Sequence, residues 1–196
     1  MHKETSTNPF LMDPFATADQ RNIIQRHRYT LDFIGSRHLG RTLDVGDRNP
    51  LTVRLEEKFG VSIESTTGDL DSIDLDGMFN TIFCFEVIEH LMNPLRLLQG
   101  LRRILRPNGS LFLSTPKHKP HFLWDVHHFT ELDRQRLQSL VDRAAFSISR
   151  NAEFRTMPFW WYFTGVRPLV RMFFNKIFIL ELRPIDTPSY SSRIIT

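Results

Sequence analysis

The 196-residue sequence has few of the features that mark secreted or membrane-spanning proteins. Its single cysteine, Cys84, excludes an internal disulfide. No uninterrupted apolar run reaches the roughly 18 residues that a bilayer-spanning helix needs. The first ten residues, MHKETSTNPF, lack the apolar core of a secretory signal. Together these absences predict a reducing, cytoplasmic location.

An excess of charge of one sign is also lacking. The 25 Lys and Arg residues stand against 22 Asp and Glu residues, which is too even a balance to indicate a nucleic-acid-binding protein. With 41% hydrophobic and 24% charged residues, the composition excludes a disordered chain, a collagen and a disulfide-rich miniprotein. The length fits a single globular domain that spans the whole chain.

The residue patterns divide this domain into five parts. Residues 1–16 hold two prolines and few periodic apolar positions, which predicts a loose arm. Residues 17–40 show apolar positions at helical spacing and predict a helical cap. Residues 41–156 form the predicted core. They are followed by an aromatic insertion at 157–175 and by a last strand and tail at 176–196.

Short apolar strands alternate with helices over residues 42–145, which predicts an α/β fold with a mostly parallel sheet and helices on both faces. Asn-Pro pairs at 49–50 and 93–94 mark two helix starts, because Asn caps a helix and Pro fits its first turn. Residues 80–86 form a nearly continuous apolar run, typical of a strand buried on both faces. A further helix is expected to begin at Thr130.

The segment LDVGDRNP joins the first predicted strand to the next helix. It places Asp44, Gly46 and Asp47 where the carboxyl end of a parallel strand meets a helix N-terminus. Open α/β sheets bind polar or anionic groups at this position. The alternative interpretation is that the glycine only ends the strand.

A second set of polar residues follows the next strand. Glu64 stands 18 residues after Gly46, a spacing at which an acidic side chain can accept hydrogen bonds from ribose hydroxyls. Asp69 then offers a carboxylate to an adenine amino group, and Leu70 offers an apolar contact to the ring. A solvated acidic loop whose aspartates only initiate turns is the other interpretation, and both stay open.

Five segments between residues 43 and 146 form a combined signature: LDVG, GDL, FCFEVIEHLMNP, LRPNGSLFLSTP and HHFTELDRQRLQSLV. This signature resembles class I S-adenosylmethionine-dependent methyltransferases, in particular the small-molecule branch that includes the ubiquinone-biosynthesis type. The resemblance implies a Rossmann-like fold, S-adenosylmethionine as methyl donor, S-adenosylhomocysteine as product and a small-molecule acceptor. Methylation is expected on oxygen.

The resemblance also implies roles for individual residues. Gly46 and the residues after it correspond to those that hold the methionine moiety, Glu64 to the ribose ligand, and Asp69 with Leu70 to the adenine contacts. The expected cofactor-binding positions are Asp44, Gly46, Asp47, Glu64, Asp69, Leu70, Phe85, Glu86 and, from the N-terminal helix, Arg28. The glycine-poor sequence GDRNP after the first strand motivates an alternative, a non-catalytic protein that binds S-adenosylmethionine.

Methylation of an oxygen atom is helped by a base. His90, His127 and His128 are the candidates, because an imidazole with a pKa near ~6.5 accepts protons at neutral pH. His90 can instead cap the turn after the strand. One member of the adjacent pair must point away from any common site.

The same region contains a possible metal-binding pattern. Glu86, Glu89 and His90 stand at i, i+3 and i+4, and His128 or His127 can complete a divalent metal site. Some methyltransferases with this pattern, including small-RNA 2′-O-methyltransferases, use such a metal, whereas many relatives with the same residues do not. We expect no metal, and metal-assisted RNA 2′-O-methylation is the second alternative function.

The predicted strands FSISRNAEF and KIFILEL flank the insertion MPFWWYFTGVRPLVRMFFNK, in which aromatic and basic residues alternate. Trp160 and Trp161 are expected to contact the substrate if the insertion forms a lid over an apolar or lipid-linked acceptor. Packing in the core or in a homodimer, and peripheral contact with a membrane, are the other interpretations.

Overall fold

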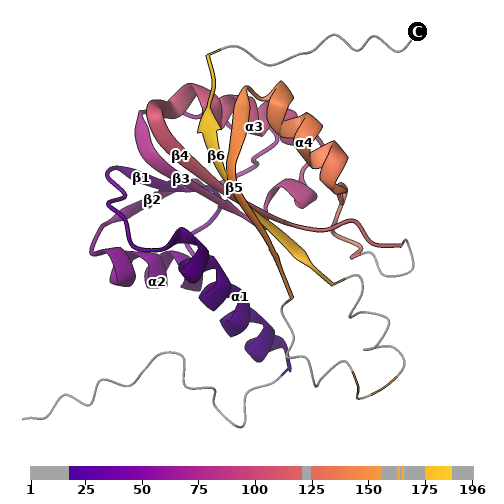
Figure 1. Cartoon of the computed structure of the whole chain (residues 1–196). Coiled ribbons are helices and arrows are strands. Elements are labelled where there is room, and N and C mark those ends of the chain that lie inside the picture. The colour runs from indigo at the N-terminus through magenta and orange to yellow at the C-terminus, as the bar shows by residue number, and fades with distance from the viewer. Residues whose placement is uncertain (1–17, 121–124, 156–162, 164, 166–174, 187–196) are drawn as a thin grey trace, which may run out of the picture.

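The computed structural model describes residues 18–120, 125–155, 163, 165 and 175–186. These residues form a six-stranded sheet of order β2-β1-β3-β4-β6-β5 with helices packed against it (Figure 1). The elements are α1 (Ala18–Ile34), β1 (Thr42–Asp44), α2 (Pro50–Phe59), β2 (Ile63–Ser65), β3 (Phe79–Phe85), η1 (Ile88–His90), α3 (Pro94–Ile104), β4 (Leu105–Pro116), α4 (Arg134–Arg143), β5 (Phe146–Phe154) and β6 (Ile177–Pro184).

The sheet is parallel over β2, β1, β3 and β4, as predicted. Strand β6 runs antiparallel between β4 and β5 and pairs with both. Because β1 has β2 on one side and β3 on the other, the chain changes direction across the sheet at β1. In open α/β sheets a ligand binds at such a switch point, outside the carboxyl ends of the strands.

Helices cover both faces of the sheet, which confirms the prediction (Figure 1). On one face, α1 and α2 pack over Phe83 and Phe112 through Leu31, Ile34 and Leu55. On the other face, α3 and α4 pack over a larger buried cluster. Its strand and helix members include Leu43, Ile82, Cys84, Leu98, Leu101, Leu111, Leu113, Leu137 and Val141.

Local sequence signals set the helix ends. The Asn49 side chain accepts hydrogen bonds from the Leu51 and Thr52 N–H groups, and the Thr52 hydroxyl accepts one from the Asn49 N–H. Gly60 then ends α2 in the left-handed conformation at φ 64°. Asn93 caps α3 by accepting from the Arg96 N–H at 3.1 Å. Both Asn-Pro pairs therefore act as predicted.

Replacing the α3 cap, Asn93→Ala, is expected to lower the free energy of unfolding by about 1 kcal/mol, because the Arg96 N–H loses its side-chain acceptor and keeps only the Asn93 carbonyl. Urea unfolding followed by circular dichroism measures the change. Gln99→Ala, at an exposed position of the same helix, is the matched control and should stay within about 0.5 kcal/mol of the unsubstituted chain. An equal effect of both substitutions would contradict the capping role.

One predicted helix start is wrong. Helix α4 begins at Arg134 with Asp133 as its cap, not at Thr130. The preceding residues are held elsewhere: Leu132 bridges to Lys117, and Thr130 lies beside η1 through a bond from its N–H to the Glu89 carbonyl. Tertiary contacts therefore keep this segment out of a helix until Asp133.

The predicted arm at 1–16 and nearly all of the aromatic insertion, including Trp160 and Trp161, lie outside the described residues. Among the helices that the structure does describe, none combines the length and the apolar character that crossing a membrane requires.

Candidate functional site

Two hollows meet at the carboxyl ends of the parallel strands. The first hollow lies over β1, β3 and β4 at the switch point of the sheet, between α1 and the start of α2. Its lining combines polar and apolar side chains. The lining residues are Arg26, His27, Thr30, Asp44, Asn49, Leu51, Phe85, Glu86, Ser114 and Phe154.

Asp44, the last residue of β1, places a buried carboxylate in the first hollow. Its Oδ2 accepts a hydrogen bond from the Thr52 hydroxyl at 2.5 Å. Burial raises the pKa of Asp44 to about 6, although the bond from Thr52 acts in the opposite direction. At neutral pH the hollow therefore contains a negative charge with little solvation, which favours a cationic ligand group.

Glu86 follows β3 and joins three elements. It adopts a positive φ of 55°, which is unusual for a residue with a side chain. Its N–H donates to the Ser114 carbonyl, and its carboxylate accepts from the Ser114 hydroxyl at 2.8 Å and from Arg26 Nη1 at 3.0 Å. These contacts hold the carboxylate at the boundary between the hollows, since Arg26 and Glu86 line both.

The arginine of α1 that lines both hollows is Arg26, whereas Arg28, which the sequence predicted for the cofactor, lines neither. Arg28 has a side chain that is 68% exposed and lies 4.0 Å from Asp32 on the outer face of the helix. Two residues along a helix rotate a side chain by roughly 200°, so both arginines cannot face the same hollow.

His27 provides a buried group without a partner in the first hollow. Among the described residues, its Nδ1 atom has no hydrogen-bond partner, and the side chain is buried. Burial, followed by the charges of Arg54 and Arg26, lowers the pKa of His27 to about 4. His27 is therefore neutral at pH 7.

The Gly46 N–H, which the sequence predicted as a cofactor contact, has an acceptor within the protein. The Gly46 N–H already donates to the Thr66 hydroxyl at 2.7 Å. A methyl group built on Gly46, which has a φ of 112°, would meet nothing within 4 Å, so open space lies beside it. Asp47 is exposed next to this space, and Arg48 is paired with Glu56, whose pKa falls to about 2 through that bond.

The three residues predicted for the ribose and adenine lie outside the lining of the first hollow. Glu64 is exposed and accepts two hydrogen bonds from Arg41, at 2.7 and 3.1 Å. Asp69 accepts from the Ser72 hydroxyl and the Asp71 N–H in a turn. Leu70 packs partly buried against the core. Their cofactor roles stay predictions.

The second hollow adjoins the first and is mostly polar. It lies beside η1, the end of β4, the start of β6 and the segment around His128. Its lining residues are Asn22, Arg26, Glu86, Glu89, His90, Pro116, Lys119, Asp125, His128, Asn175, Lys176 and Ile177.

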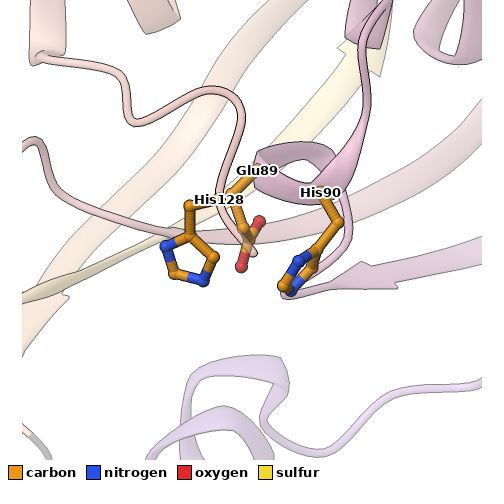
Figure 2. A group of neighbouring side chains, drawn as sticks. All are labelled: Glu89, His90 and His128. Atoms are coloured by element: carbon orange, nitrogen blue, oxygen red, sulfur yellow. The ribbon is translucent and has the colours of Figure 1, made fainter. Parts of the chain in front are cut away.

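The three candidate histidines differ in position: two of them line the second hollow and one does not. The rings of His90 and His128 lie edge to face, with centroids 4.9 Å apart, and both side chains point into the same space (Figure 2). His90 Nδ1 lies 3.0 Å from the His127 carbonyl oxygen, so His127 contributes its backbone to this arrangement. The His127 residue itself is exposed and does not line the second hollow.

Glu89 lies between these two rings and is buried (Figure 2). Its Oε2 accepts from the Thr115 hydroxyl at 3.1 Å. Burial, followed by the negative charge of Glu86, raises the pKa of Glu89 to about 8. One ligand atom each from Glu89, His90 and His128 lies within 4.8 Å of the others, so these three can hold a metal ion. Glu86, expected as a fourth ligand, is not in this group because Arg26 and Ser114 bind it.

Comparison with known proteins agrees with the fold described above. A family model described as a methyltransferase domain matches residues 3–164, most of the chain. The chain belongs to this methyltransferase family. The match includes α1, the parallel strands and the segment that carries His128. The whole lining of the first hollow therefore falls within it, as does that of the second hollow except for Asn175, Lys176 and Ile177.

Among curated relatives, the ubiquinone biosynthesis O-methyltransferase of Pseudomonas paraeruginosa is 29% identical over 82 residues. That match covers 40% of this chain and about a third (35%) of the relative's length. The mitochondrial enzyme of the same name from Dictyostelium discoideum is 40% identical over 53 residues, which cover 27% of this chain and 16% of the relative.

Solved structures of low sequence identity share the fold. An S-adenosylmethionine-dependent methyltransferase from Mesorhizobium loti has a TM-score of 0.56 at 13% identity, covering 85% of this chain and 100% of that one. A 1,6-didemethyltoxoflavin-N1-methyltransferase from Burkholderia thailandensis, solved with S-adenosylhomocysteine, has a TM-score of 0.53 at 14% identity, covering 82% and 76%. The predicted Rossmann-like methyltransferase fold is thereby confirmed.

Proposed function

We propose that this chain transfers a methyl group from S-adenosylmethionine to an oxygen atom of a small molecule. The observation that carries the proposal is the pair of adjoining hollows at the strand ends of a methyltransferase domain. The first hollow has the charges that suit the amino-acid group of the cofactor. The second hollow has the imidazoles of His90 and His128, and the Arg26–Glu86 ion pair lines both hollows.

The residues of the first hollow fit the amino-acid end of the cofactor. Asp44 and Glu86 supply carboxylates for an ammonium group, and Arg26 supplies a guanidinium for a carboxylate. His27 Nδ1, buried without a partner among the described residues, supplies one further hydrogen-bonding atom. When bound there, S-adenosylmethionine provides an electrophilic methyl group attached to a sulfonium.

The second hollow supports an acceptor that carries a hydroxyl group. We infer that His128 accepts the hydroxyl proton, because its ring points into the hollow and is only partly exposed. His90 packs edge-on against it and limits its rotation. The remaining contribution of the chain is positioning, which supplies much of the rate of a displacement between two bound groups.

Two lines of support favour oxygen and a small molecule. The curated relatives are named O-methyltransferases, although the chain covers only about a third of the first of them. The lining of the second hollow is polar and mixed in charge, which suits a hydroxylated compound of modest size rather than a phosphate backbone. Contact with an apolar or lipid-linked acceptor through Trp160 and Trp161 stays a prediction, since these residues lie outside the described part of the chain.

Arg26 and Arg28 form a matched pair for testing the cofactor site. Calorimetric titration with S-adenosylmethionine and S-adenosylhomocysteine is expected to show binding by the unsubstituted chain. Arg26→Gln should weaken it by about 10- to 100-fold, because a charge-assisted hydrogen bond contributes about 1.5–3 kcal/mol. Arg28→Gln, which removes an equal charge two residues away on the outer face, should leave the affinity unchanged.

The outcomes of this titration separate the functional alternatives. Binding followed by release of S-adenosylhomocysteine with a member of a panel of phenols and catechols supports the transferase. Binding without turnover of any phenol, catechol or short RNA would favour the non-catalytic alternative. Equal effects of Arg26→Gln and Arg28→Gln on the affinity would show that the cofactor does not bind in the first hollow.

Metal-assisted transfer is a second candidate, favoured by the convergence of Glu89, His90 and His128. A carboxylate and two imidazoles are the donors that several divalent transition metals accept. Equilibrium dialysis with Mn²⁺ or Zn²⁺, followed by elemental analysis, tests it. Retention of about one ion per chain, lost in Glu89→Gln, would support this candidate, and turnover unaffected by a chelator would exclude it.

A further inference from the structure

His128 has a buried acidic partner that does not line the second hollow. Its Nδ1 lies 2.9 Å from Oε1 of Glu131, three residues further along the chain. The Glu131 side chain is fully buried. Lys119 compensates the cost of burying this carboxylate in two ways. Its Nζ lies 3.1 Å from Oε1 of Glu131, and its backbone N–H donates a hydrogen bond to Oε2 at 3.1 Å.

This contact determines which nitrogen of His128 carries the proton. A carboxylate has acceptors only, so the Nδ1 atom that faces Glu131 must be the donor. In a neutral imidazole the other nitrogen, Nε2, then has a free lone pair. Without a partner, an imidazole in water favours the opposite tautomer, with the proton on Nε2. A base in that tautomer has no lone pair to offer at Nε2.

We propose that Glu131 is a positioning residue that fixes His128 in the Nδ1–H tautomer and presents Nε2 to the acceptor. This inference deepens the proposed function, since it rests on His128 as the proton acceptor. Lys119 neutralises the charge of the buried Glu131 carboxylate. Glu131 never touches the acceptor, because His128 stands between them.

The segment that carries both residues is anchored independently of their contact. The Phe129 and Thr130 N–H groups both donate to the Glu89 carbonyl, and the Glu89 side chain is held by Thr115. Removing the Glu131 carboxylate therefore leaves the backbone of His128 attached to η1. A change at His128 on substitution of Glu131 then reports the side-chain contact rather than a displaced loop.

Nitrogen-15 NMR of the histidine rings tests the proposal directly. The two-bond proton–nitrogen correlation pattern is recorded for the full chain at a pH above the imidazole titration, and His128→Gln identifies the His128 signals. The unsubstituted chain is expected to show His128 as Nδ1–H. Glu131→Ala should shift it mainly to Nε2–H, and Glu131→Gln should shift it in the same direction by a smaller fraction.

Lys119→Met is the matched control, because it removes the ammonium and leaves the carboxylate opposite His128. His128 should keep the Nδ1–H tautomer in this variant. If Glu131→Ala does not fold, the comparison of Glu131→Gln with Lys119→Met decides. A proton on Nε2 in the unsubstituted chain, or an unchanged tautomer when Glu131 is replaced, overturns the proposal.

The S-adenosylmethionine titration keeps this inference separate from the proposed function. Cofactor binding with the wrong His128 tautomer overturns the role of Glu131 alone. The expected tautomer without any cofactor binding overturns the proposed function and leaves the positioning contact standing. With any phenol that is turned over, Glu131→Ala should lower kcat by about 10- to 100-fold and leave the KM for S-adenosylmethionine unchanged.

Discussion

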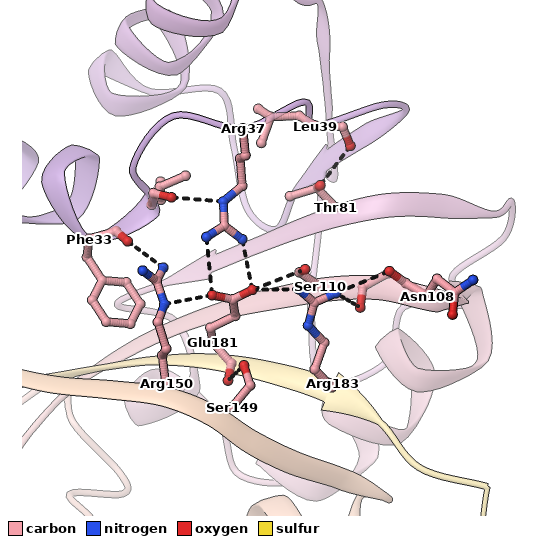
Figure 3. A network of polar contacts seen from close by, with 12 residues as sticks. Phe33, Arg37, Leu39, Thr81, Asn108, Ser110, Ser149, Arg150, Glu181 and Arg183 are labelled. Atoms are coloured by element: carbon pink, nitrogen blue, oxygen red, sulfur yellow. Dashed lines mark hydrogen bonds and ion pairs between the residues drawn. The ribbon is translucent and has the colours of Figure 1, made fainter.

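Replacing Glu181 with leucine is expected to lower the free energy of unfolding by about 3–5 kcal/mol. Glu181 is a buried residue of β6, with a side chain that is 4% exposed. Its carboxylate binds Arg37 at 2.8 Å, Arg150 at 2.9 Å and Arg183 at 2.9 Å (Figure 3). Removing the carboxylate that the three arginines share leaves mutually repelling guanidinium groups, and breaking a buried pair from one side costs about this much.

The cluster ties together parts of the chain that are far apart in sequence. Arg37 follows α1 and also donates to the Ile34 carbonyl, whereas Arg150 lies on β5 and donates to the Phe33 carbonyl. Glu181 therefore fixes the end of α1 against the antiparallel half of the sheet (Figure 3). Because α1 carries Arg26 and His27, loss of this anchor should also weaken cofactor binding.

The pH dependence of this contribution has a definite sign. Burial raises the pKa of Glu181, but the hydrogen bond from Arg37 and the charges of the three arginines outweigh it, and the pKa lies below its usual value. A carboxyl with a lowered folded pKa stabilises the fold above its unfolded pKa and loses that effect as pH falls through the folded value. The difference between the chain and Glu181→Leu should therefore shrink in acid.

Urea unfolding of both proteins at pH 7 and near pH 3 measures these effects. Glu153→Leu is the control, because Glu153 is partly exposed on the neighbouring strand and pairs with Lys176 at 3.4 Å and Lys117 at 3.6 Å. Such a pair contributes at most about 1 kcal/mol. Equal effects of the two substitutions would show that the arginine cluster contributes no more than a surface ion pair.

The sequence predicted most of the fold because local signals and the strand-helix alternation agreed. The Asn-Pro pairs and Gly60 gave helix bounds that the structure confirms within a residue. The start of α4 could not be found in this way, since nothing local forbids helix at Thr130. The contacts that keep this segment out of a helix come from Lys117, which follows β4, and from Glu89 in η1, more than ten residues away in the chain.

The candidate site was only partly predictable from the sequence. Motif spacing does not tell which residues of α1 face the site or which side chains pair with one another. Motif spacing led to Asp44, Glu86 and His128, all of which line the hollows. Spacing did not lead to Arg26, which lines both hollows, and it led to Arg28, which lines neither. The buried positions of α1 at His27, Thr30, Leu31 and Ile34 define the inner face, and Arg26 adjoins it.

Glu131 was missed as a partner of His128 although it stands only three residues away. Residues 128–131, all within the described part of the chain, belong to no helix or strand, so periodicity offers no rule for the pair. The interaction exists because the turn from His128 to Leu132 is held against η1 and β4, which brings the two side chains together. Such a contact depends on tertiary structure and is visible only once the segment is placed.

Asp44→Asn is expected to change stability and cofactor binding in opposite directions. The pKa of Asp44 is raised to about 6 by burial, from an ordinary value near 3.8. The folded chain therefore binds more protons than the unfolded chain in this range, and the carboxyl makes stability fall as pH rises from about 4 to about 6. Two units of pKa correspond to roughly 3 kcal/mol, an upper limit for the cost at pH 7.

Asparagine removes this cost and keeps an oxygen that accepts from the Thr52 hydroxyl. Without cofactor, the Asp44→Asn variant should thus be more stable than the unsubstituted chain at pH 7 by about 1–3 kcal/mol, with no gain near pH 3.5. Asp47→Asn, which replaces an exposed carboxylate on the same loop, should show no such gain. Thermal unfolding at both pH values measures the difference.

Cofactor binding by the Asp44→Asn variant should become weaker, although its stability increases. The charge that destabilises the free protein is the one that attracts the ammonium group of the proposed ligand, so Asp44→Asn should weaken S-adenosylmethionine binding by about 10- to 100-fold. A functional site commonly keeps such a cost in the free state. A variant that is both more stable and equally tight in binding would show that the Asp44 charge destabilises the free protein without contributing to cofactor binding. A variant that loses stability at pH 7 would instead show that the charged form is favoured by contacts to Thr52 and its surroundings.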